Sequence, residues 1–285
     1  MYPPKFDYLR ADSAANALEL LAANPDAKVM AGGHSLIPAM NLRLADPGTI
    51  IDIGRVADFK FLSANDGYVG IGSGTTHAEV AASSDVPSAL SEAAGLIGDP
   101  QVRNRGTVGG NIAHADPASD LPTVLVALGA TISTVSGSGT RMIKAGDFFV
   151  DLFETALNDG ELVAEISMNQ DGANTGSAYA KLSNPASRYA MVGAAARVTV
   201  EGGVFTAVSV AVGGLTPKAQ AAPSVNAALV GQAATADNIA AAAAAVQNDL
   251  GDDVMGDIHA SADYRRQMAT VFVKRALTKA TERAG

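Results

Sequence analysis

Cysteine is absent from this 285-residue chain, so the chain forms no disulfide and offers no thiolate as a nucleophile or metal ligand. A cysteine-ligated zinc ion or iron–sulfur cluster must therefore belong to another polypeptide. Histidine is scarce too, and His77, His114 and His259 have no spacing typical of a metal site. The sequence predicts no metal centre in this chain.

Positive charge is also limited. Lysine and arginine total 20 against 29 aspartates and glutamates, which gives a net charge of −9. A chain with this balance lacks a basic face to neutralise nucleic-acid phosphates, so we expect no nucleic-acid partner. Residues 1–10 lack the basic and apolar regions of a signal peptide, and the longest uncharged stretch, residues 121–140, is rich in glycine, serine and threonine. We expect a cytoplasmic protein without a transmembrane segment.

The N-terminal part of the chain alternates predicted helices and strands. Apolar residues at helical spacing predict the helices, and β-rich runs between turn signals predict the strands. The expected helices are residues 13–23, 36–44, 77–82, 89–97 and 120–128, and the expected strands are 28–30, 49–53 and 68–72. The pattern is that of a mixed α and β fold.

A polar, glycine-bearing segment at residues 169–176 has no apolar period to bury, and it predicts a domain boundary. Beyond it, residues 191–200 and 204–212 alternate β-formers around Gly202 and Gly203, which is typical of an antiparallel hairpin. Helices are expected at 240–245 and 260–280. The chain length and its 48% hydrophobic content suit two or three domains. We place them at residues 1–55, 56–170 and 177–285.

Two glycine segments, residues 31–35 and 106–111, have the composition of anion-binding turns. Adjacent glycines let backbone amides approach a pyrophosphate closely. Neither segment has the spacing of a Rossmann or Walker motif, and each alone is also typical of ordinary chain reversal. Together they predict a dinucleotide held from two sides.

The same segments carry a family resemblance. Residues 31–38 and 98–111 resemble the FAD loops of carbon monoxide dehydrogenase medium subunits, which are similar to the flavin domain of xanthine dehydrogenase. The resemblance continues through residues 115–122, 147–149 and 187–190. It implies an α+β fold: an FAD-binding fold of the vanillyl-alcohol oxidase/PCMH type with two α+β subdomains, followed by a C-terminal antiparallel sheet with helices.

The resemblance also implies roles for individual residues. Main-chain amides of both segments would bind the FAD pyrophosphate, through Ala31, Gly32, Gly33, His34, Ser35, Leu36, Thr107, Gly109, Gly110 and Asn111. Asp120 matches an acidic residue that contacts the ribityl chain or ring edge, Lys181 a lysine near the isoalloxazine, and Tyr189 an aromatic residue beside the ring. Arg188 departs from the family pattern, in which an acidic residue often precedes the tyrosine.

Several polar residues near these segments have two interpretations. His34 either bonds the flavin or phosphate, or shapes its own loop. For Arg103 and Arg105 a structural ion pair is the commoner outcome. Asp116 lies four residues before Asp120, but the intervening Pro117 makes a helical carboxylate pair doubtful, so Asp116 is expected to be a cap or loop acceptor.

The function implied by the resemblance is that of a FAD-binding electron-transfer subunit, without catalytic residues of its own. Its partners would be an iron–sulfur small subunit with [2Fe-2S] clusters and a molybdopterin-binding large subunit with the molybdenum cofactor, assembled as a dimer of heterotrimers. One alternative is a stand-alone FAD-dependent oxidoreductase related to the enolpyruvyl reductases. Another is a scaffold subunit that has lost its cofactor. Flavin absorbance excludes the scaffold, and activity that requires partner subunits excludes the stand-alone enzyme.

Overall fold

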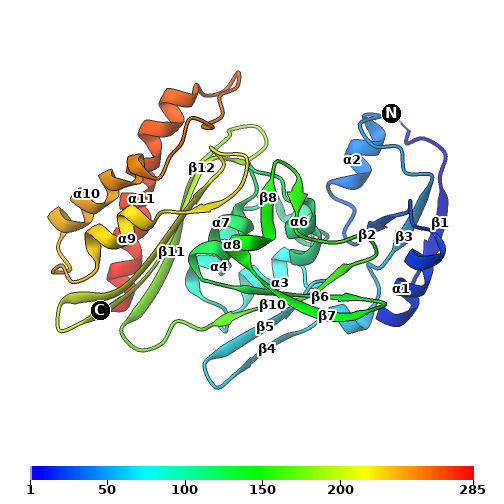
Figure 1. The fold of residues 1–285 in the computed structure, drawn as a ribbon, viewed down its shortest axis with the longest axis horizontal. Coiled ribbons are helices and arrows are strands. Elements are labelled where there is room, and N and C mark those ends of the chain that lie inside the picture. Colours follow the sequence, from blue (N-terminus) through cyan, green and yellow to red (C-terminus); the bar gives the residue numbers. More distant parts are fainter. Residues whose placement is uncertain (1) are drawn as a thin grey trace.

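A computed structural model describes residues 2–285. Three sheet-centred units follow one another along the longest axis of the molecule, from the N-terminal sheet at one end to the C-terminal sheet at the other (Figure 1). The predicted α+β class is confirmed.

The first unit is a three-stranded parallel sheet in the order β1-β3-β2, with strands β1 (Asp7–Arg10), β2 (Lys28–Met30) and β3 (Thr49–Asp52). The strand β1 was not predicted from the sequence. Helix α1 (Ala14–Ala23) follows β1 and begins where the Ser13 side chain accepts from the Asn16 amide at 3.1 Å. The parallel arrangement brings the chain after β2, which holds the first glycine segment, to the carboxyl edge of the sheet.

Helix α2 (Leu36–Asn41) is shorter than the predicted 36–44. Its C-cap is Leu42, and Arg43 adopts a left-handed backbone with φ of 63°. A helix cannot continue through that conformation, so the apolar residues beyond Asn41 lie outside it. Leu42 and Leu44 are exposed.

The second unit has a five-stranded antiparallel sheet in the order β4-β5-β10-β6-β7. Its strands are β4 (Leu62–Asn65), β5 (Tyr68–Gly72), β6 (Thr131–Ser136), β7 (Gly139–Lys144) and β10 (Leu162–Asn169). Its helices are α3 (His77–Ala82), α4 (Ser88–Leu96), α5 (Pro100–Arg103), α6 (Val108–His114), α7 (Asp120–Ala127) and α8 (Ala145–Phe148). The unit also contains a small hairpin of β8 (Phe149–Asp151) and β9 (Glu154–Thr155), and a 3-10 turn at Ala57–Phe59. Every residue of α7 is buried, because this helix packs between α4 and the C-terminal sheet.

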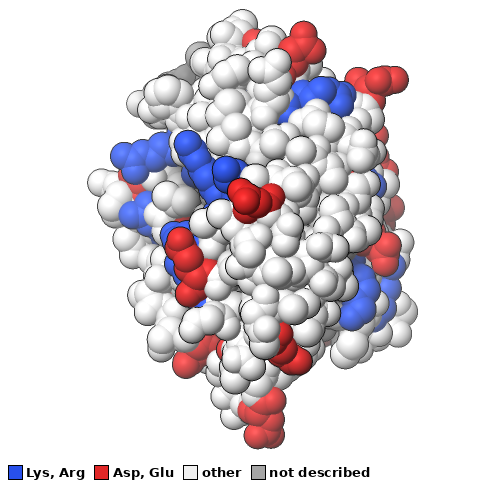
Figure 2. All heavy atoms as spheres, turned by 90° about the vertical axis from the view of Figure 1, so that its left-hand side faces the viewer, with Lys and Arg blue, Asp and Glu red and all other residues white. Residues whose placement is uncertain are grey.

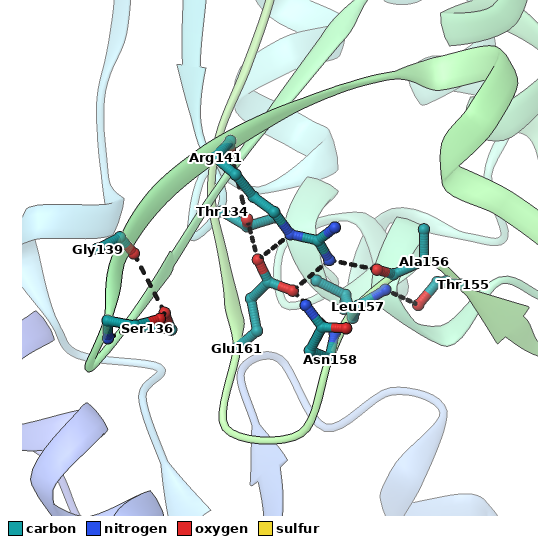
Figure 3. A network of polar contacts seen from close by, with 10 residues as sticks. Thr134, Ser136, Gly139, Arg141, Thr155, Ala156, Leu157, Asn158 and Glu161 are labelled. Carbon is teal, nitrogen blue, oxygen red and sulfur yellow. Dashed lines mark hydrogen bonds and ion pairs between the residues drawn. The ribbon is translucent and has the colours of Figure 1, made fainter.

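Glu161 is the centre of a hydrogen-bond network at the edge of this sheet (Figure 3). Its carboxylate accepts two hydrogen bonds of 2.6 Å from the Arg141 guanidinium, one of 2.8 Å from the Asn158 amide, and a further one from the Thr134 hydroxyl. These donors, Arg141 foremost, lower the pKa of Glu161 to about 2. The network fixes the β6–β7 hairpin against the chain that enters β10.

The C-terminal unit is an antiparallel sheet in the order β11-β12-β13-β14, and with its helices it confirms the predicted C-terminal architecture. Its strands are β11 (Thr175–Ser183), β12 (Ala190–Glu201), β13 (Val204–Gly213) and β14 (Gln220–Ala221), and its helices are α9 (Pro223–Leu229), α10 (Ala236–Ala244) and α11 (Ala262–Ala284), with a 3-10 turn at Ala245–Asn248. The predicted hairpin turns at Gly202 and Gly203, with φ of 58° and 78°.

The two faces of the C-terminal sheet belong to different cores. On β11, Ala178, Ala180 and Leu182 pack into the cluster shared with α11, whereas Tyr179 packs into the cluster of the central unit. The outer surface at the C-terminal end of the molecule carries charges of both signs separated by uncharged side chains (Figure 2). Across residues 2–285 the structure has no helix that combines the length and the apolar character needed to cross a bilayer.

Candidate functional site

The two glycine segments are in direct contact. A Cβ atom placed on Gly32 would overlap the carbonyl oxygen of Arg105 and lie 3.0 Å from the Cα of Gly106. Only glycine at position 32 permits this approach of the two backbones. The structure thus brings together the segments that the sequence predicted to act together.

The first glycine segment presents a run of unpaired amides. Gly33 has φ of 73°, and its carbonyl accepts the Ile37 amide at 3.0 Å, which starts the first turn of α2. Within residues 2–285, the amides of residues 32–36 have no hydrogen-bond acceptor. Consecutive amides at the start of a helix form a concave binding site for an anion.

His34 shapes this segment. Its Nδ1 lies 2.9 Å from the carbonyl oxygen of Gly32 and donates to it. One of the two interpretations of His34 is therefore observed. Contact of the same ring with a cofactor stays a prediction.

The second glycine segment differs from the open loop expected from the sequence. Thr107 is the N-cap of α6, and Gly109 and Gly110 form the first turn of that helix. The amide of Val108 donates to Thr75 at 3.0 Å, and that of Gly109 to Ser73 at 2.8 Å. The amides of Gly110 and Asn111 bond the side chain and the carbonyl of Thr107. These four amides therefore already have acceptors within the chain.

His77, which sequence reasoning treated only as an unsuitable metal ligand, lies beneath the second segment. Its amide donates to the Gly106 carbonyl at 3.0 Å, and a Cβ on Gly106 would lie 2.9 Å from the ring Nε2. The ring is buried, and its Nδ1 has no partner within residues 2–285. Burial, with a smaller effect of His34, lowers the pKa of His77 to about 4. The imidazole is therefore neutral near pH 7.

Asp120, the first residue of α7, is 4% exposed and anchors a second polar cluster. It accepts the Tyr179 hydroxyl at 2.6 Å and the Lys181 ammonium at 2.9 Å. Burial raises the pKa of Asp120, while both donors favour its ionised form. Tyr179 was not predicted, because a tyrosine in a β-strand is typical of a core.

The loop between β11 and β12 places Tyr189 next to this cluster. Tyr189 is 43% exposed, so it does not pack into the core. Partial burial and the carboxylates of Asp116 and Asp120 raise the pKa of Tyr189. Asp116 itself accepts the Ala118 amide at 2.9 Å, which makes it the loop acceptor that was predicted.

Asn111 connects the glycine segments to the Asp120 cluster. Its side-chain oxygen accepts the hydroxyl of Ser119, the N-cap of α7, at 2.7 Å. The structural role expected for Arg103 is observed, although its guanidinium bonds the carbonyls of Ile97 and Gly98 and forms no ion pair within residues 2–285. The predicted site residues thus form one connected region along the carboxyl edge of the first sheet, α6 and α7.

Comparisons with known proteins show the family of this chain. Residues 4–168 match the family described as the FAD binding domain in molybdopterin dehydrogenase, and residues 177–280 match the CO dehydrogenase flavoprotein C-terminal domain. The chain belongs to the FAD subunits of the molybdenum hydroxylases. FAD is the cofactor of this family, and the members are oxidoreductase subunits.

Relatives that align over nearly the whole length of this FAD subunit support the same family. The alpha subunit of the 6-hydroxypseudooxynicotine dehydrogenase complex from Paenarthrobacter nicotinovorans is 39% identical, over 100% of this chain and 97% of that protein. The glyceraldehyde dehydrogenase medium chain of Sulfolobus acidocaldarius is 37% identical, over 97% and 98%. A structure of carbon monoxide dehydrogenase from Hydrogenophaga pseudoflava contains a chain with a TM-score of 0.95 and 38% identity, covered completely in both directions. These relatives are subunits of multi-subunit enzymes, and the match confirms the predicted fold of the FAD subunit.

The residues of this FAD subunit fit the cofactor. The pyrophosphate of FAD needs several donors at close range, and the amides of residues 32–36 offer five consecutive donors without acceptors of their own within residues 2–285. The absence of a side chain at Gly32 lets the second segment close against the first.

Proposed function

We propose that this chain binds FAD along the two glycine segments and is the electron-transfer subunit of a heterotrimeric molybdenum hydroxylase. The proposal extends to an iron–sulfur small subunit whose [2Fe-2S] clusters supply electrons, a molybdopterin-binding large subunit, and an external acceptor. It also includes assembly as a dimer of heterotrimers. The absence of cysteine supports clusters held by another polypeptide, and the relatives named as medium chains support a multi-subunit complex.

The unpaired amides of residues 32–36 are the observation on which the proposal depends most. We assign the pyrophosphate to Ala31, Gly32, Gly33, His34, Ser35 and Leu36. From the second segment, Thr107 supplies the amide that has no acceptor within residues 2–285, and Gly109, Gly110 and Asn111 supply the shape. Asp120, Lys181 and Tyr189 are assigned to the flavin end, with Lys181 acting indirectly. The units 1–55, 56–170 and 177–285 remain the proposed domains.

When bound, FAD supplies a centre that accepts electrons singly and can release two together. The chain's own residues orient it and set its surroundings. Asp120 and Lys181 place a buried ion pair at the flavin end, and Tyr189 covers part of that end from the solvent side. No residue of this chain is assigned a proton transfer.

Substrate choice is proposed to lie outside this chain. Relatives with 36–39% identity are named for 6-hydroxypseudooxynicotine, glyceraldehyde and carbon monoxide. Chains so alike serve enzymes of very different substrates, which argues against selection of the substrate within this subunit. The large subunit is the natural place for that selection.

The test is made on the full chain, purified alone and together with the products of its neighbouring genes. We expect flavin absorbance and extractable FAD equimolar with the chain, and substrate oxidation only when the partner subunits are present. Colourless protein without extractable FAD in both preparations would refute the FAD assignment. Substrate turnover by the FAD-loaded chain alone would refute the electron-transfer role and favour a stand-alone oxidoreductase.

A further inference from the structure

The ammonium group of Lys181 is bonded to three different segments of the chain. It donates to Asp120 at 2.9 Å, to the Leu96 carbonyl at the end of α4 at 3.0 Å, and to the Arg188 carbonyl at 2.7 Å. Its side chain is 2% exposed. An ammonium has three hydrogens, so each is used within the chain and none is left to donate to a cofactor.

The Arg188 carbonyl belongs to a tight turn, residues 184–189, that carries Tyr189. The Asn184 side chain accepts the amides of Ala186 and Ser187 at 2.9 and 3.0 Å. The Asn184 amide donates to the Tyr189 carbonyl at 2.8 Å. These bonds keep the turn compact but do not fix it to the rest of the molecule.

External bonds decide where this turn lies. Besides Lys181, the Arg188 guanidinium reaches the Gly98 carbonyl at 3.2 Å, and the Ala190 amide donates to Ala118 at 3.0 Å. Arg188 has φ of 62°, a backbone conformation that is unfavourable for arginine and needs support from its surroundings. The buried Lys181 ammonium provides such support directly at the Arg188 carbonyl.

We propose that Lys181 is a positioning residue of the cofactor site: its ammonium holds the turn 184–189 against Asp120 and the end of α4, and thereby fixes Tyr189 without touching the cofactor. This inference rests on the proposed function, because it assumes that FAD lies beside Asp120 and Tyr189. It assigns to Lys181 a role different from the direct contact near the isoalloxazine that the family resemblance implies.

The test measures how accessible the bound flavin is in the FAD-loaded full chain. The variants are Lys181→Met, Tyr189→Ala, the double variant, and Lys274→Met as a control that removes an exposed lysine from α11. Iodide quenching of flavin fluorescence reports accessibility. We expect Lys181→Met and Tyr189→Ala to raise the quenching constant by similar factors, the double variant to raise it no further, and Lys274→Met to leave it unchanged.

Additive effects would overturn the inference. If Lys181→Met raised quenching in the Tyr189→Ala background by its full factor, Lys181 would act on the flavin directly. A wild-type chain that binds no FAD would instead refute the proposed function and would be recognised before any variant is compared.

A second variant guards against misfolding of Lys181→Met, which leaves a buried carboxylate without its cation. Asn184→Ala loosens the turn while Lys181 and Asp120 stay in place. We expect it to raise quenching in the Tyr189-containing chain and to have no effect in Tyr189→Ala. Unchanged quenching in Asn184→Ala would show that the turn does not control access, which contradicts the inference.

Discussion

Replacing Gly32 with alanine tests the contact on which the cofactor site is built. The new methyl group would overlap the carbonyl oxygen of Arg105, a backbone atom that cannot move aside by a rotamer change. Gly48 offers a matched control in the same sheet unit, because a Cβ there meets nothing within 4 Å. Neither glycine has a positive φ, so alanine adds steric overlap at position 32 and only a methyl group in open space at position 48.

The loss of FAD affinity depends on whether the FAD-free chain can relieve the steric overlap that the FAD-bound chain must accept. Forcing an extra methyl group into a packed contact costs about 1–3 kcal/mol. Without FAD, the first segment can move away from the second, because its amides at residues 32–36 have no bonds to lose within the described chain. With FAD the segments must close again, so most of the cost appears in binding. Since about 1.4 kcal/mol is tenfold, FAD affinity should fall by roughly 5- to 100-fold.

Calorimetric titration of the deflavinated full chain with FAD measures this difference, and thermal unfolding of the same samples without FAD reports folding. We expect Gly32→Ala to bind FAD more weakly with little change in apo stability, and Gly48→Ala to match the wild type in both. Wild-type affinity in Gly32→Ala would refute the reasoning, because it would mean that contact of the two segments is not required for binding.

Three further predictions concern stability and are measured by denaturant unfolding. Arg141 lowers the pKa of Glu161 from 4.5 to about 2, so the carboxylate stabilises the fold above pH 4.5 and loses this effect as the pH falls towards 2. Because Arg141 is partly exposed, Glu161→Gln should cost only about 1 kcal/mol of unfolding free energy at pH 7. An unchanged pH profile of stability below pH 4.5 in this variant would contradict the prediction. Burial lowers the pKa of His77 from 6.5 to about 4, so only the unfolded chain gains this proton between those values. Stability should therefore fall on the order of 2 kcal/mol as the pH drops from 6.5 to 4, and His77→Gln should flatten that part of the curve. Tyr179→Phe removes a donor from the buried Asp120 carboxylate and should cost about 1.5–3 kcal/mol, whereas a loss below about 0.5 kcal/mol would show that the contact is replaced.

Local sequence signals were sufficient to predict the elements that are specified by their own residues alone. Apolar residues at helical spacing predicted α1, and Gly202-Gly203 between alternating β-formers predicted the C-terminal hairpin. Both signals act within a few residues, through the helical period and a positive φ. They need no partner elsewhere in the chain.

The strands β6, β7 and β10 escaped prediction because long-range pairing defines them. Strand β10 runs between β5 and β6, which are distant in sequence, and its last residue lies in the polar stretch that has the composition of a linker. The turn of the β6–β7 hairpin is made of serine and glycine, which is typical of a flexible loop. Tertiary pairing overrides such local composition.

The same limit applied to the second glycine segment. Gly109 and Gly110 are poor helix formers, so propensity indicates a loop. The structure places Gly109 in a helix because its backbone packs on Ser73, where a side chain would collide, and because Thr107 caps the first turn. Neither the distant strand end nor the closeness of the packing could be inferred from residues 106–111 alone.

Strand β11 of the C-terminal sheet adds two polar side chains to the candidate site, because apolar and polar residues alternate along it. Tyr179 and Lys181 are two residues apart on β11 and share a face, while Ala178, Ala180 and Leu182 pack towards α11 on the other. The requirement to bury the small apolar face against α11 therefore directs both polar side chains to Asp120. A slip of β11 by one residue would turn Lys181 into the α11 core and an alanine or leucine towards Asp120. The packing of an apolar helix face thus sets the register that delivers a hydroxyl and an ammonium to a buried carboxylate at the start of α7.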